Sequence, residues 1–299
     1  TEAIGEPLPI LALGGTVATP AGGIVGEVVE ITDLEQITEA VKGKIVFFNR
    51  PFDPTLLSTF KGYSAAGDQR FRGPAKAAAA GAVAAIVRSM TPNLDEIPHT
   101  GGTVTPEGTK AIPAAAVSTL GAERIAAHLA RGVVRLKLEL SCQTLPDKKS
   151  YNVVGELTGR EHPEEVVVIG GHLDSWDVGQ GAHDCGAGVT QTIEALRLLK
   201  ALDLRPRRTL RVVAFMNEEN GTRGARAYAA AHKAELGNLV MALESDRGGF
   251  TPRGFTTDAN PRAKAILETL AGLLKQSGAD KVIEGYGGAD IGKLKGAGA

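Results

Sequence analysis

Three apolar runs in the second half of the chain have the composition of β-strands, and each is followed by acidic residues. The runs are Glu165–Ile169, Thr209–Met216 and Asn238–Leu243. Between the first two, Val189–Leu202 carries apolar residues at helical spacing, as expected for a helix with one buried face. Because strands that alternate with helices form largely parallel sheets with helices on both faces, we predict an α/β fold with a mixed, mostly parallel sheet flanked by helices.

The first part of the chain has a different pattern and is expected to form a smaller domain. Ile24–Ile31 alternates like a strand, and Lys44–Phe48 is a short apolar strand. We predict a β-rich α/β domain over residues 1–131 and a second domain over residues 132–299, with the alternating segment 133–142 as a strand of the second. The first domain contains no dense cluster of acids and histidines, so catalysis is expected in the second.

Charge, hydropathy and cysteine content exclude several classes of function. The formal net charge is -1 over 299 residues, which offers no electrostatic footprint for nucleic acid or an anionic membrane. The most apolar run, Ala77–Val87, is far shorter than the ~20 residues that span a bilayer. We therefore expect no nucleic-acid or membrane partner. Two cysteines, Cys142 and Cys185, are too few for a disulfide framework, and the sequence leaves open whether they pair.

Metal-ligating side chains gather where the three apolar runs end. They are His172, Asp174, Asp184, Glu218, Glu219 and Asp246. In open α/β sheets, ligands bind beyond the carboxyl ends of the strands, so these side chains are expected to lie along one edge. Five carboxylates brought together without a partner would repel one another and raise each other's pKa. One or two divalent cations would remove that repulsion, and the sequence therefore predicts a metal site.

Elementary chemistry indicates a role for each of these groups. A ring nitrogen of His172 suits zinc, and Asp174 could accept the other ring N–H and fix the tautomer. Asp184 has two carboxylate oxygens and could bridge two metals. Adjacent Glu218 and Glu219 cannot both point the same way at an extended strand end, so one can bind metal while the other takes a proton from water. Paired metals would activate that water and polarise a carbonyl.

The run HLDSWDVGQGA, followed in order by the EE and ESD motifs, resembles the M28 metallopeptidases and is closest to their plasma glutamate carboxypeptidase branch. Residues 1–131 resemble the protease-associated insert of that branch, and residues 132–299 resemble most of its peptidase domain. The resemblance implies a zinc exopeptidase-like fold and a hydrolase that releases terminal residues from peptides or dipeptides. Whether it acts as an aminopeptidase or a carboxypeptidase stays open. By the same resemblance, we expect a secreted or periplasmic homodimer.

The resemblance also implies which residues hold two zinc ions. His172 and Asp246 would bind one ion, Glu219 would bind the other, and Asp184 would bridge them. The family takes a final histidine for the second ion from a segment beyond Gly287–Ala299. We therefore expect a chain truncated at both ends, with an incomplete second metal site and weak or no activity.

Two further assignments come from the resemblance, together with one departure from it. Glu218 would be the general base and then the acid that protonates the leaving amine, and Asp174 would orient His172. Where the branch usually has a second acid after the bridging aspartate, this chain has Cys185, to which no function is carried over.

Other classes of function remain to be weighed against the exopeptidase. A non-catalytic relative could keep the fold for binding, and a metal-dependent deacylase could use the same metals. The four ligands and the Glu218 base favour an enzyme, because binding relatives lose such ligands. The glycines at 186–188 precede a helix but lack the third glycine of a dinucleotide-binding loop.

Overall fold

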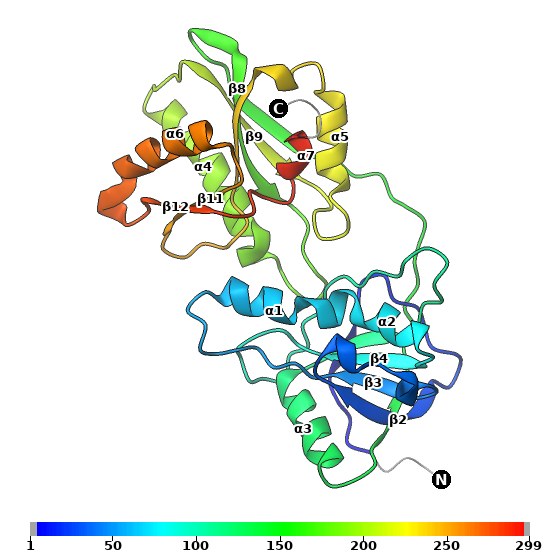
Figure 1. Cartoon of the computed structure of the whole chain (residues 1–299). Helices are drawn as coiled ribbons and strands as arrows, with labels where there is room; N and C mark the ends of the chain where they lie inside the picture. Colours follow the sequence, from blue (N-terminus) through cyan, green and yellow to red (C-terminus); the bar gives the residue numbers. More distant parts are fainter. Residues whose placement is uncertain (1–4, 296–299) are drawn as a thin grey trace. The chain divides into compact units, whose positions relative to one another are not determined.

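The computed structural model describes residues 5–295 and divides the chain into two compact units. The first unit ends at Asp147 and the second begins at Lys148. In Figure 1 the first unit is coloured from blue to green and the second from green to red.

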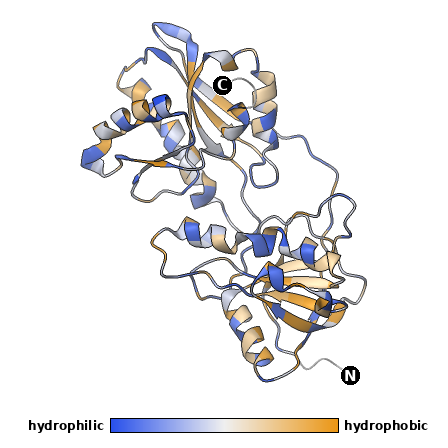
Figure 2. Ribbon diagram, viewed as in Figure 1, coloured by the Kyte–Doolittle hydropathy of each residue, from blue (hydrophilic) through white to orange (hydrophobic). Residues whose placement is uncertain are grey.

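The first unit is built on a six-stranded sheet with the order β1-β5-β4-β3-β2-β6. Its strands are β1 (Ile10–Ala12), β2 (Ile24–Ile31), β3 (Ile45–Phe48), β4 (Ala84–Arg88), β5 (Ala114–Val117) and β6 (Arg135–Leu138). Strands β2, β3, β4 and β5 are parallel, whereas β1 and β6 are antiparallel edges. The helices are α1 (Thr59–Phe71), α2 (Gly73–Ala79) and α3 (Thr119–Leu129). Every residue of β3, β4 and β5 is buried, which matches their apolar colouring in Figure 2.

The boundary between the two units differs from the one expected at residue 131. Strand β6 lies inside segment 133–142, but it pairs with β2 in the sheet of the first unit, with Ile24 opposite Leu138. The boundary therefore falls between Asp147 and Lys148. Alternation identified this segment as a strand, but it carries no information about which distant strand is its partner.

The second unit contains a four-stranded sheet with the order β10-β8-β9-β7. Its strands are β7 (Val153–Leu157), β8 (His162–His172), β9 (Arg208–Phe215) and β10 (Leu239–Glu244). Strand β8 is parallel to both of its neighbours, and β7 is antiparallel to β9. The mixed, mostly parallel sheet is as predicted from the sequence. Because β8, β9 and β10 are adjacent and parallel, their carboxyl ends share one edge.

The helices of the second unit pack against this sheet or against the small sheet that follows it. They are α4 (Ala187–Ala201), α5 (Arg223–Ala231), α6 (Pro261–Ala271) and the short α7 (Gly292–Lys295). Buried apolar side chains of β8 and β9 pack with those of α5, and α4 packs against the same two strands. A two-stranded parallel sheet of β11 (Gly254–Thr257) and β12 (Lys281–Glu284) follows. Within residues 5–295, no helix has the length and apolar character needed to cross a membrane.

One glycine of the segment 186–188 brings α4 close to the end of β10. A Cβ atom at Gly188 would lie 1.8 Å from the carbonyl oxygen of Ser245, a distance that no side chain tolerates. The glycine is therefore required for helix–strand packing. This packing accounts for a glycine at the start of α4, and no phosphate-binding role is needed to explain it.

Candidate metal centre

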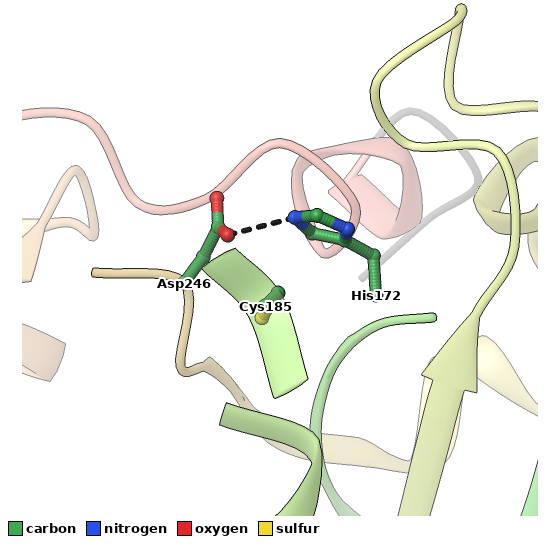
Figure 3. A group of neighbouring side chains, drawn as sticks. All are labelled: His172, Cys185 and Asp246. Carbon is green, nitrogen blue, oxygen red and sulfur yellow. Dashed lines mark hydrogen bonds and ion pairs between the residues drawn. The ribbon is translucent and has the colours of Figure 1, made fainter. Parts of the chain in front are cut away.

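His172 is the last residue of β8, and its imidazole lies between carboxylates from two other segments. Its Nε2 atom is 2.9 Å from Oδ1 of Asp246, in the loop after β10, and 3.1 Å from Oδ1 of Asp184. The side chain is only 1% exposed. Figure 3 shows the imidazole facing Asp246, with Cys185 nearby. The parallel register of β8 and β10 thus brings together two side chains that are 74 residues apart in the sequence.

Two overlapping groups in the described part of the chain at this edge have the geometry of a metal site. His172, Asp184 and Glu219 form one group, and His172, Cys185 and Asp246 form the other. Within each group the potential ligand atoms lie within 4.8 Å of one another. The structure therefore brings together the four residues that the sequence nominated as ligands.

Cys185 lies within this centre but has the properties of a packed thiol. It is buried, and its Sγ donates a hydrogen bond to the carbonyl oxygen of Ser245 over 2.9 Å. Burial raises the pKa of the Cys185 thiol to about 12, which favours the protonated thiol when no metal is bound. Cys185 and Cys142 are both free, which answers the question of pairing that the sequence left open.

Asp174 contacts His172 through a different group from the one expected. Nδ1 of His172 lies 2.9 Å from the backbone carbonyl oxygen of Asp174, and the Asp174 carboxylate is 3.8 Å from the same nitrogen. The carboxylate instead accepts the backbone N–H groups of Glu218 over 2.9 Å and Glu219 over 3.1 Å. Asp174 therefore orients the imidazole with its main chain and holds the turn after β9 with its side chain.

The turn after β9 separates the two adjacent glutamates. Strand β9 ends at Phe215, and Asn217 adopts the left-handed conformation with φ of 69°. This turns the chain, so Glu218 and Glu219 do not continue an extended strand. The carboxylate of Glu219 accepts a hydrogen bond of 2.6 Å from the indole Nε1 of Trp176, whereas Glu218 belongs to neither of the ligand groups.

Burial and mutual repulsion set the protonation of this cluster. Burial, reinforced by neighbouring carboxylates, raises the pKa of Glu218 to about 7, and burial and the charge of Asp184 do the same for Glu219. Burial by itself lowers the pKa of His172, but hydrogen bonds to Asp184 and Asp246 outweigh it and raise that pKa to about 12. A proton on the imidazole therefore compensates the surrounding negative charge when no metal does so.

Three further polar side chains lie near this edge of the sheet. Trp176 belongs to the motif recognised in the sequence, but nothing in that motif indicated its contact with Glu219. The carboxylate of Glu244, the last residue of β10, accepts three successive backbone N–H groups of the segment 289–291 over 2.9–3.0 Å. Asp290, in that segment, is completely buried, and neither of its carboxylate oxygens has a hydrogen-bond partner. These long-range contacts leave no mark in local sequence patterns.

A peptidase family model and two curated carboxypeptidases match this chain. The model of peptidase family M28 matches residues 152–290. Carboxypeptidase Q from Homo sapiens is 38% identical over 288 residues, which cover 95% of this chain and 59% of that protein. Carboxypeptidase Q from Mus musculus is also 38% identical and covers 95% of this chain and 60% of its own length. The chain thus spans about three fifths of the length of these curated relatives.

Solved structures agree with the fold. A peptidase M28 precursor from Shewanella amazonensis superimposes with a TM-score of 0.91 at 35% identity, covering 98% of this chain and 67% of that one. A zinc aminopeptidase from Bacillus subtilis superimposes with a TM-score of 0.67 at 20% identity, covering 99% of this chain and 68% of that one. The second match shows a similar fold.

Proposed function

This chain belongs to peptidase family M28, and we propose that it is a zinc-dependent exopeptidase that releases terminal residues from peptides or dipeptides. The observation that carries the proposal is the buried His172 imidazole, which faces the carboxylates of Asp184 and Asp246 at the carboxyl ends of parallel strands. Relatives named carboxypeptidase and zinc aminopeptidase support the reaction class and the metal.

The donor set fits zinc for a specific reason. The carbonyl oxygen of Asp174 accepts only a protonated Nδ1 of His172, so the neutral imidazole would direct its Nε2 lone pair toward two carboxylates. That arrangement is repulsive unless a proton or a metal cation lies between them. One imidazole nitrogen together with carboxylate oxygens is a donor set that zinc accepts. A carbonyl that fixes the tautomer of a metal-binding histidine is also a common feature of such sites.

We assign the ligands as the sequence suggested. His172 and Asp246 would hold one zinc ion, Glu219 would hold a second, and Asp184 would bridge the two. When bound, zinc lowers the pKa of a water molecule and polarises the carbonyl of the scissile bond. The number of ions that this chain retains is the quantity to measure.

Glu218 is the proposed general base. Asp174 fixes its backbone N–H, and burial raises the pKa of its carboxyl to about 7. A group with a pKa near the working pH can both take up and release a proton. Glu218 would therefore accept a proton from the attacking water and deliver it to the leaving amine.

The proposal also covers the first unit, the localisation and the oligomeric state. We propose that the first unit, with its six-stranded sheet, is the protease-associated insert. We also propose that the protein is a secreted or periplasmic homodimer. Neither nucleic acid nor membrane is a proposed partner. The oligomeric state can be measured by light scattering coupled to gel filtration.

Zinc content and exopeptidase activity together test the function. Protein purified without chelator and dialysed against trace zinc would be analysed for zinc per chain, and hydrolysis would be followed with free and terminally blocked dipeptides. Zinc binding with weak hydrolysis of a free dipeptide is the expected result, and loss of hydrolysis when one terminus is blocked identifies the terminus that the enzyme recognises. Release of the blocking acyl group itself would favour the metal-dependent deacylase, and a chain that binds no zinc would favour a non-catalytic binding relative.

A further inference from the structure

Two side chains of the loop after β8 form hydrogen bonds with the turn after β9. The Asp174 carboxylate accepts the backbone N–H groups of Glu218 and Glu219. Two residues further on, Trp176 donates its indole N–H to Oε2 of Glu219 over 2.6 Å. Glu219 is therefore held both at its main chain and at its carboxylate by the same short loop.

The carboxylate of Glu219 takes part in two sets of contacts. It contributes an oxygen to the group formed with His172 and Asp184, in which the ligand atoms lie within 4.8 Å of one another. It also receives the indole hydrogen bond from Trp176. A carboxylate whose oxygen accepts such a hydrogen bond cannot rotate freely. Only the lone pairs that the indole does not use remain available to a cation.

The indole is well suited to such a task because of its chemistry. Its Nε1–H is a donor only, does not titrate and has no lone pair for a metal. It can thus hold a carboxylate oxygen without competing for the cation or exchanging protons with the site. The Trp176 side chain is half-buried, so the hydrogen bond is partly shielded from water.

We propose that Trp176 is a positioning residue for Glu219: its indole N–H fixes one carboxylate oxygen so that the other is directed toward a metal ion shared with Asp184. This inference rests on the proposed zinc function. Outer-sphere partners of this kind typically change metal affinity by roughly 10–100-fold when they are removed. Since Trp176 is the single tryptophan of the chain, the tryptophan emission comes from this side chain alone and responds to changes in its surroundings.

Three variants test the proposal. Trp176→Phe keeps an aromatic ring but removes the N–H donor, and Glu219→Gln removes the charged acceptor. Tyr151→Phe is the matched control, because it also removes a polar group from an aromatic ring of the second unit. Zinc affinity would be measured by competition with a chromogenic chelator, and tryptophan emission would be followed during a zinc titration. Melting of each metal-free variant verifies that it is folded.

The expected result has two parts. Zinc shifts the tryptophan emission of the wild-type protein, and Glu219→Gln abolishes that shift. Trp176→Phe binds a zinc ion roughly 10–100-fold more weakly than the wild type, whereas Tyr151→Phe is unchanged.

Different outcomes separate this inference from the proposed function. Wild-type zinc binding with unchanged tryptophan emission, or equal affinity in Trp176→Phe, would overturn the role of Trp176 and leave the zinc site in place. The emission measurement uses the wild-type chain, so it decides the matter even if Trp176→Phe does not fold. A wild-type chain that binds no zinc would refute both the metal function and the positioning role.

Discussion

Nε2 of His172 lies 2.9 Å from Oδ1 of Asp246, although the two residues are 74 positions apart in the chain. Strands β8 and β10 are parallel neighbours, so the side chains that follow them meet at one edge of the sheet. This pairing joins the first motif of the sequence to the last.

Replacement of His172 should remove the metal. His172→Ala deletes the one nitrogen donor among the proposed ligands and leaves carboxylates that repel one another, so we expect zinc per chain to fall close to zero. Elemental analysis after dialysis against trace zinc measures this. His128→Ala is the control, since exposed His128 on α3 belongs to none of the candidate ligand groups found among residues 5–295 and its loss should not change zinc content. A fully loaded His172→Ala protein would contradict the ligand assignment.

Replacement of Glu218 should separate catalysis from metal binding. Glu218→Gln keeps the size of the side chain but cannot accept a proton, so turnover is expected to fall by about 10²–10⁴ while zinc content stays the same. Activity on free dipeptides, in a version extended to the length of the carboxypeptidase relatives, and elemental analysis measure the two quantities. Glu219→Gln is the comparison, because it should lose metal as well. If Glu218→Gln retains wild-type turnover, another residue is the base.

The buried Asp290 should make stability depend on pH. Burial, together with the charges of Glu244 and Glu218, raises the pKa of Asp290 from 3.8 to about 8 in the folded protein. Between these values the folded state binds a proton that the unfolded state has released, so stability falls as the pH rises from about 4 to about 8. Urea unfolding of Asp290→Asn in the presence of chelator should show a shallower decline. The exposed Asp280→Asn control should follow the wild type, and an equal slope for all three proteins would refute this account.

Loss of the Glu244 carboxylate should loosen the segment 289–291. Its three hydrogen bonds to successive N–H groups have no replacement in Glu244→Ala, so we expect a loss of roughly 1–3 kcal/mol in the free energy of unfolding. Hydrogen exchange should accelerate at the amides of 289–291. Exchange in α5 is the internal reference, and selective acceleration there instead would count against a local role for Glu244.

Local patterns were sufficient to predict the main elements of the second unit. The apolar run Thr209–Met216 became β9, and the helical spacing of Val189–Leu202 became α4, with ends shifted by one or two residues. These features repeat over two or four residues, so neighbouring side chains alone reveal which face is buried. The ligand candidates followed from the same runs, because the carboxyl ends of parallel strands gather at one edge.

The sequence by itself determined the mostly parallel sheet and the set of side chains at its edge, whereas the tertiary structure decided which of them touch. In the tertiary structure, β6 pairs within the first unit, and Trp176 forms a hydrogen bond with Glu219 across 43 residues. The Asp174 carboxylate accepts two backbone N–H groups and does not hydrogen-bond to His172. The physical reason is that the periodicity of a strand or helix depends on adjacent residues, while a hydrogen-bond partner depends on where two distant segments meet.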